Sequence, residues 1–318
     1  MREHIFATIE VAAGTTILGE RLPRRRLHSV ESLASEAKLD PRTLRKVLAA
    51  RGLVPIDGKV TGYHVFDADE GDRVAATIQR STNVISLPKA LNCTRPQAGQ
   101  LVDEGMLDPI ADGRKRVAGW TRKAIDNRDI ERFLLALRAS ARPVDKAVEG
   151  MVPISKAAEK ARLSCMEIVH LVLGGFLQNI ARIGEVEGYA AILVDPVEIR
   201  TQKALHLPGI SASEAFARLK LPKSTGWGLV HREENPRLEP IVIEGPNLQH
   251  RFFRFSEETV AAFASEYTTE IRVANANDVE KKDVVATLKK RGVRPVLGEA
   301  EIGLDLYRSA AIPMIEPA

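Results

Sequence analysis

Apolar residues recur at helical spacing in the stretch from Ser29 to Pro55, SVESLASEAKLDPRTLRKVLAARGLVP. The apolar positions of its first part follow an i, i+3, i+4, i+7 pattern, which predicts a helix with one buried face from about Val30 to Ala37. These positions are Val30, Leu33, Ala34 and Ala37. Ser29 is suited to accept a hydrogen bond from the free N–H groups at the start of this helix.

A second helix follows after a short turn. Asp40 is suited to cap it, Pro41 fits its first position, and Gly52 can end it in a conformation with positive φ. Its inward residues are Leu44, Val47 and Leu48. The whole stretch therefore predicts a helix-turn-helix.

The outer face of the second helix is polar and mostly basic near its N-terminus. The residues there are Arg42, Thr43, Arg45 and Lys46. In helix-turn-helix proteins this part of the second helix reaches base edges and phosphates in the major groove. A helical hairpin with a solvated basic face explains the same pattern, and for this stretch alone the two interpretations weigh equally.

The order of elements around this stretch recurs along the chain. Short strands around Gly58 and Gly62 and a trailing helix from about Asp67 to Gln79 complete a winged-helix repeat. Looser copies follow at spacings of roughly 50–70 residues, which is typical of an array. The predicted fold is therefore mainly α with small β wings, a tandem array of winged helix-turn-helix units. The five predicted repeats span 1–80, which includes a basic arm, and then 81–143, 144–206, 207–267 and 268–318.

The second repeat, which opens at Ile85, places polar residues where the first has its basic face. Its predicted outward contacts are Thr94, Arg95 and Gln97, and its wing carries Arg114, Lys115 and Arg116. This ordering resembles the excisionase and MerR-like winged helices.

The later repeats depart from the basic pattern. The third has Ser164, Met166 and Glu167 at the outward positions, and a carboxylate there repels phosphates, so we expect this repeat to pack against neighbours or a protein partner. The fourth offers Lys223, Ser224 and Thr225, although Gly226 and Gly228 weaken its second helix. The fifth has a helix ending LKKRG, and Arg291 to Val296 match the pattern of Arg51 to Ile56.

Basic charge is concentrated at the N-terminus. Residues 1–60 hold 11 Lys and Arg against 7 Asp and Glu, whereas the rest of the chain holds 35 of each. Arg24, Arg25 and Arg26 lie directly before the first helix-turn-helix, where a basic arm can follow a phosphate backbone or enter a minor groove. A solvated, flexible loop is the alternative.

Residues that would carry catalysis or bind a metal are scattered. The 7 histidines have no ligand spacing, and the 2 cysteines, Cys93 and Cys165, are too far apart in the sequence for a zinc motif. No nucleophile elbow or phosphate-binding loop is present, so we expect no enzymatic activity and no cofactor. Without a long apolar run or the apolar core of a signal peptide, the expected location is the cytoplasm, associated with a bacterial nucleoid.

One family resembles much of the chain. RRRLHSVESLASEAKLDPRTLRKVLAARGLVP, the repeats after it, and the ending KKRGVRPV with LDLYRSAAIP together resemble the C-terminal region of TniQ-family proteins. The resemblance implies a role in target-site selection for DNA transposition and an AAA+ transposition ATPase as partner. The family's cysteine-rich zinc ribbon has no counterpart here, so we expect either a C-terminal fragment of a longer protein or a relative with another role.

These observations favour a non-enzymatic, sequence-specific double-stranded DNA-binding protein of a mobile element, acting in target-site selection or recruitment in transposition. A transcriptional regulator with the same contacts, or a protein–protein assembly scaffold, are the alternatives. Phosphate anchoring is expected from the arm and the second wing, and sequence reading from the second helices. The candidate DNA-binding residues are Arg24, Arg25, Arg26, Arg42, Thr43, Arg45, Lys46, Thr94, Arg95, Gln97, Arg114, Lys115, Arg116, Lys223, Ser224 and Thr225.

Overall fold

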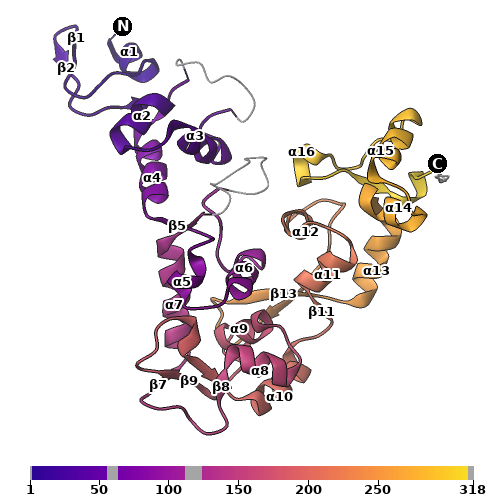
Figure 1. Ribbon diagram of the computed structural model, residues 1–318. Coiled ribbons are helices and arrows are strands. Elements are labelled where there is room, and N and C mark those ends of the chain that lie inside the picture. Colours follow the sequence, from indigo (N-terminus) through magenta and orange to yellow (C-terminus); the bar gives the residue numbers. More distant parts are fainter. Residues whose placement is uncertain (1, 56–63, 112–123, 314–318) are drawn as a thin grey trace. The chain divides into compact units, whose positions relative to one another are not determined.

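The computed structural model describes residues 2–55, 64–111 and 124–313. It is mainly helical with several small sheets, as the sequence predicted at this coarse level (Figure 1). The chain divides into two compact bodies, which are described separately. The N-terminal body comprises Met1–Ala90 with Leu107–Glu131, and the C-terminal body comprises Leu91–Met106 with Arg132–Ala318. Among the described helices, none has the length and apolar character needed to cross a membrane.

The N-terminal body contains the first predicted repeat. Its elements are α1 (Arg2–Thr8), β1 (Thr16–Ile17), β2 (Glu20–Arg21), β3 (Leu27–His28), α2 (Val30–Ala37), α3 (Pro41–Ala50), β4 (Phe66–Asp67), α4 (Ala68–Gln79), β5 (Ser81–Asn83), α5 (Leu87–Leu91), β6 (Ala124–Asp126) and the start of α7 (Asn127–Ala139). The predicted first helix and the predicted start of the second are confirmed. The strands predicted around Gly58 and Gly62 lie outside the described residues.

Local capping explains where α2 begins and ends. The Ser29 hydroxyl accepts from the Ser32 N–H at 3.2 Å, and the Ser32 hydroxyl accepts from the Ser29 N–H at 3.1 Å, which makes a reciprocal capping box. At its other end Lys38 adopts a left-handed conformation with φ 53°. Leu33, Leu44 and Leu48 are fully buried between the two helices and α4, so the predicted apolar faces form the core of this body.

The C-terminal body holds the remaining elements. They are α6 (Arg95–Asp103), β7 (Arg142–Val144), β8 (Val152–Pro153), α8 (Ile154–Ala161), α9 (Cys165–Leu173), β9 (Ile180–Ile183), the 3₁₀ helix η2 (Tyr189–Ala191), β10 (Ile192–Val194), α10 (Pro196–His206), β11 (Ile210–Ser211), α11 (Ala212–Arg218), α12 (Lys223–Val230), β12 (Ile241–Glu244), β13 (Arg251–Phe255), α13 (Glu257–Glu266), β14 (Tyr267–Thr269), α14 (Glu270–Asn277), α15 (Lys281–Lys290), α16 (Glu299–Ile302), β15 (Leu306–Arg308) and the 3₁₀ helix η3 (Ser309–Ala311). Its sheets have the strand orders β7-β9-β10-β8, β11-β13-β12 and β14-β15. Of the described pairings, β7 with β9 is parallel and the others are antiparallel.

One local conformation recurs in all five predicted repeats. A residue other than glycine takes φ 52° or 53° in the turn between the two helices of each repeat. These residues are Lys38, Asn92, Arg162, Lys220 and Asp278. In each repeat a strand before the helix pair also hydrogen-bonds antiparallel with a strand after it: β3 with β4, β5 with β6, β8 with β10, β11 with β13, and β14 with β15. The repetition in sequence is therefore a repetition of backbone conformation.

Gly226 allows close packing between α12 and α11. The sequence indicated that this glycine weakens the second helix of the fourth repeat, yet α12 is formed from Lys223 to Val230. A Cβ at Gly226 would lie 2.5 Å from the ring of Phe216 on α11. Because Phe216 is fully buried, the ring has no room to move, and only glycine allows α12 to approach α11 this closely.

Two neutral histidines lie inside the C-terminal body. His170 Nδ1 is 3.2 Å from His250 Nε2, and the His170 ring stacks on Phe252 with centroids 4.4 Å apart. Burial lowers the pKa of His170 to about 3, with help from the neighbouring His250 and from Arg254. Burial also lowers the pKa of His250 to about 4.

We expect the C-terminal body to lose stability in mild acid. Below about pH 6.5 the unfolded chain takes up a proton at each histidine while the folded chain does not, so the free energy of unfolding falls as pH falls toward the folded pKa values. From pH 7.5 to 5.5 the pair accounts for roughly 3 kcal/mol. Urea unfolding followed by Trp227 fluorescence in a Trp120→Phe background measures it. A His250→Gln chain with the same pH dependence as its parent would contradict this assignment.

Candidate nucleic-acid interface

The geometry of α3 is set by a cap at one end and a buried stripe along its length. The Asp40 carboxylate accepts from the Thr43 N–H at 2.8 Å, and this hydrogen bond lowers the pKa of Asp40. Leu44, Val47 and Leu48 are at most 1% exposed. With these residues held inward, the polar positions of the first two turns face away from the core.

The outward side of α3 is basic. Arg42 is exposed, and Arg45 and Lys46 are half-buried. Within the described part of the chain, Arg42 and Lys46 form no ion pair. The structure therefore brings three of the predicted contacts together on one helix face. The fourth, Thr43, is half-buried and donates its N–H to the cap.

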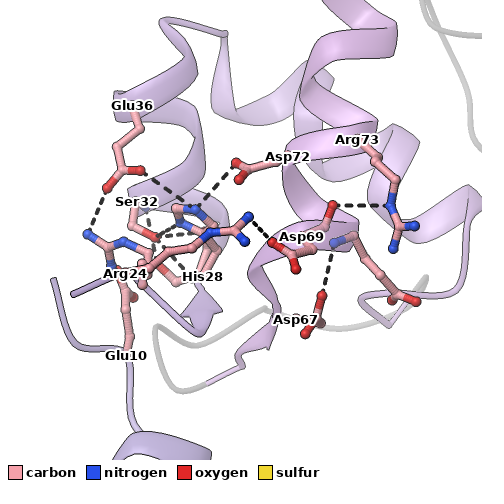
Figure 2. A network of polar contacts seen from close by, with 12 residues as sticks. Glu10, Arg24, His28, Ser32, Glu36, Asp67, Asp69, Asp72 and Arg73 are labelled. Carbon is pink, nitrogen blue, oxygen red and sulfur yellow. Dashed lines mark hydrogen bonds and ion pairs between the residues drawn. The ribbon is translucent and has the colours of Figure 1, made fainter. Parts of the chain in front are cut away.

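The predicted basic arm is tied to carboxylates of its own body (Figure 2). Arg24 pairs with Asp69, and its side chain is 70% exposed. Arg25 Nη1 lies 2.8 Å from Glu10 and Arg25 Nη2 lies 2.8 Å from Glu36, and its side chain is 14% exposed. Arg25 thus holds the arm against α2, and it is not placed to reach a phosphate.

Arg26 also has a carboxylate partner. Its Nη1 lies 2.9 Å from Glu3 on α1, and its guanidinium lies 5.4 Å from the centroid of the Phe6 ring. The side chain remains 48% exposed. An exposed ion pair is worth little and can exchange its carboxylate for a phosphate, so Arg24 and Arg26 remain available in a way that Arg25 does not.

His28 lies at the centre of the network that attaches the arm (Figure 2). It is 1% exposed, its Nδ1 is 2.9 Å from the Ser32 hydroxyl, and its Nε2 is 3.6 Å from both Glu36 and Asp72. Burial lowers the pKa of His28, with an added contribution from Arg25, although the carboxylates of Glu36, Asp72 and Glu10 act to raise it. The arm is therefore a folded part of the body rather than a solvated loop.

The predicted contacts of the second repeat differ in their exposure to solvent. Thr94 and Arg95 are exposed at the start of α6, and Thr94 caps this helix. Gln97, by contrast, is 8% exposed, accepts from the Thr94 N–H at 2.9 Å, and donates toward Cys165 Sγ at 3.6 Å. Since α6 packs on α9 here, Gln97 cannot reach DNA. Arg114, Lys115 and Arg116 lie outside the described residues.

The contacts of the fourth repeat are largely used within the protein. Lys223 Nζ lies 2.5 Å from the Asp103 carboxylate. Thr225 is 1% exposed and donates its hydroxyl to the carbonyl of Ile302 at 2.7 Å. Ser224 alone of the three is exposed. This repeat therefore presents no basic reading face like that of α3.

Glu167 in the third repeat packs inward, as expected from its charge. Its Oε1 lies 2.5 Å from Arg254 Nη1, and the two side chains are 14% and 6% exposed. The second helices of repeats two to four thus use their outward positions mainly for contacts inside the C-terminal body.

The structure also draws attention to cations that were not among the predicted contacts. Lys289, Lys290, Arg291 and Arg294 are exposed at the end of α15 and just after it. The run LKKRG was visible in the sequence as an echo of the first repeat. What the sequence could not show is that these side chains stay on the surface, while Gln97, Glu167, Lys223 and Thr225 of the middle repeats contact other parts of the C-terminal body.

Comparison with known proteins adds no relative: no protein-family model matches the chain, and neither a curated protein nor a solved structure matches it.

Proposed function

We propose that the chain is a non-enzymatic, sequence-specific double-stranded DNA-binding protein built as a tandem array of winged helix-turn-helix units, with α3 as its main recognition helix. The observation that carries the proposal is the basic outer face of α3, formed by Arg42, Arg45 and Lys46 above a fully buried apolar stripe. A helix of this kind, presented after a short turn, fits the major groove.

The recurring backbone supports the winged-helix interpretation. The left-handed turn residue fixes the angle between the two helices, and the paired flanking strands close each repeat. In repeat one, β3 with β4 ties the entry of α2 to the start of α4, and α3 packs on both α2 and α4. Such a rigid frame favours base reading, because a recognition helix must be positioned accurately to read base edges.

The residues take different roles in this proposal. Arg42 and Arg45 would contact base edges, since arginine is the usual bidentate partner of guanine in the major groove. Lys46, Arg24 and Arg26 would contact phosphates, which position the protein without reading sequence. Arg25 and His28 hold the arm in place. Repeats two to four would mainly connect the first repeat to the last one and stabilise the fold between them.

The biological use of DNA binding that we propose is target-site selection or recruitment in transposition, with an AAA+ ATPase as partner and a nucleoid-associated location. It rests on the TniQ resemblance alone. A transcriptional regulator would use the same contacts, and a map of bound sites in cells distinguishes the two, because a regulator gathers at promoters.

Duplex binding by fluorescence anisotropy across a salt series tests the proposal. We expect the logarithm of the affinity to fall linearly with the logarithm of salt concentration, with a slope of about −0.9 for each phosphate contacted. A chain that binds no duplex at low salt would refute the DNA proposal and favour the assembly scaffold.

A further inference from the structure

The last repeat carries an exposed cluster of positive charge at the end of its second helix. Residues 281–294 hold six Lys and Arg and a single acidic residue, Asp283. Lys281 pairs with Glu270 at 3.0 Å, and Lys282 pairs with Glu280 at 2.7 Å. Four cations remain that form no ion pair among the described residues: Lys289, Lys290, Arg291 and Arg294. They are called the α15 cluster below.

The backbone that carries the α15 cluster is fixed. α15 buries Val284 and Leu288 against α14 and Tyr307. After it Gly292 takes φ 67°, and the Val293 N–H donates to the Leu288 carbonyl at 3.0 Å. Val293 itself packs on the same apolar cluster. The cations therefore lie at and just after a well-defined helix C-terminus, and the backbone that carries them is fixed.

The charge pattern of α15 differs from that of α3. Counted from the turn residues Lys38 and Asp278, the positions of Arg45 and Lys46 in α3 are taken by Val285 and Ala286 in α15. The positions of Ala49 and Ala50, which are buried in α3, are taken by exposed Lys289 and Lys290. The position of Arg42 is taken by Lys282, which pairs with Glu280. Of the two base-reading positions of α3, one is therefore apolar in α15 and the other holds a paired lysine, while the helix end is basic.

Because neither base-reading position of α15 holds an arginine, the cations at its end suit contacts to phosphates, which position a protein without reading sequence. Lys282 and Lys289, which are i and i+7, lie on the same side of α15 with the small Ala286 between them, which leaves room for close approach of a DNA strand. Lysines near a helix C-terminus also interact favourably with the helix dipole. The helix dipole does not explain the presence of Arg294, because this residue lies beyond the end of the helix.

We propose that the α15 cluster is a second DNA contact that binds the phosphodiester backbone of duplex DNA without reading its sequence. This inference rests on the proposed function, since the ligand is the same duplex. Repeat one would supply specificity, and the last repeat would supply additional affinity. Because both contacts belong to one chain, binding by the first raises the effective concentration of the second near the DNA.

The test uses the full chain and a random-sequence duplex of about two to four helical turns, since a site that spans two modules needs that length. The variant is Lys289→Gln/Lys290→Gln/Arg291→Gln/Arg294→Gln. A matched control removes four exposed cations that form no ion pair among the described residues: Arg138→Gln/Lys146→Gln/Lys156→Gln/Arg200→Gln. Circular dichroism melts of both variants check that the fold is retained.

We expect the salt slope of the cluster variant to become shallower by about 2–4, because each lost phosphate contact removes about 0.9 from the slope. Affinity should fall by a similar factor on every duplex sequence, while the control keeps the wild-type slope. A wild-type chain that binds DNA, with an unchanged slope in the cluster variant or an equal loss in the control, overturns this inference alone. A wild-type chain that binds no duplex overturns the proposed function and this inference with it.

Discussion

Replacing both Arg42 and Arg45 by alanine should lower affinity for the preferred duplex by about 30-fold or more. Each good bidentate contact to a base contributes about 1–3 kcal/mol of discrimination, and about 1.4 kcal/mol is a factor of ten in affinity. Both side chains lie on the outer face of α3, opposite the buried Leu44 and Leu48, so truncation leaves the core intact. Binding to unrelated duplexes should fall much less than binding to the preferred one.

The measurement begins with selection of preferred duplexes from a random pool by the wild-type chain. Anisotropy titrations at one fixed salt concentration then compare the preferred and a scrambled duplex. Arg138→Ala/Arg200→Ala removes the same charge from exposed positions outside the first repeat and should keep the preference. If the Arg42 and Arg45 variant retains wild-type discrimination between the two duplexes, α3 is not the reading helix.

Local signals explain why the helices of the first repeat could be predicted. Ser29, Asp40 and Pro41 act within one turn of their own position, and the apolar spacing of α2 and α3 needs no partner to be recognised. The left-handed turn residue Lys38 gave no such signal, because glycine usually marks this conformation. Its place became clear only from the recurrence of the same φ in five repeats.

Long-range contacts explain why several site residues could not be predicted. Arg24 and Asp69 are 45 residues apart, Gln97 and Cys165 are 68 apart, and Thr225 and Ile302 are 77 apart. Helical periodicity places a side chain on a face, but it does not show whether a neighbouring element covers that face. The two-residue strands β3 and β4 are also too short to show any alternation of polar and apolar residues.

The repeats differ in whether neighbouring elements cover the outward face of their second helix. In α3 the outward positions stay on the surface, while the corresponding part of α9 is fastened by Glu167 to Arg254 on β13. A repeat whose outward face is occupied by its own neighbours stiffens the array. We propose DNA contact for the repeats whose second helix keeps exposed cations, the first at Arg42 and the fifth at Lys289 and Lys290.

Arg254→Met should destabilise the C-terminal body by about 3–5 kcal/mol, which is the usual effect of removing one partner from a buried ion pair. Beyond its contact with Glu167, the Arg254 side chain donates from Nε to the Pro208 carbonyl at 3.0 Å and from Nη2 to the Gly209 carbonyl at 2.7 Å. Its loss therefore leaves a mostly buried carboxylate and two carbonyl groups without their donor.

The double variant Glu167→Met/Arg254→Met distinguishes a lost charge partner from lost packing. Because it removes the unpaired carboxylate as well, it should unfold at a higher urea concentration than Arg254→Met alone. Trp227 fluorescence in the Trp120→Phe background reports unfolding of the C-terminal body. Arg218→Met, which removes an exposed arginine paired with Glu214 and Glu257, is the matched control and should stay close to its parent. An Arg254→Met midpoint equal to that of the control would mean that this ion pair does not hold α9 to β13.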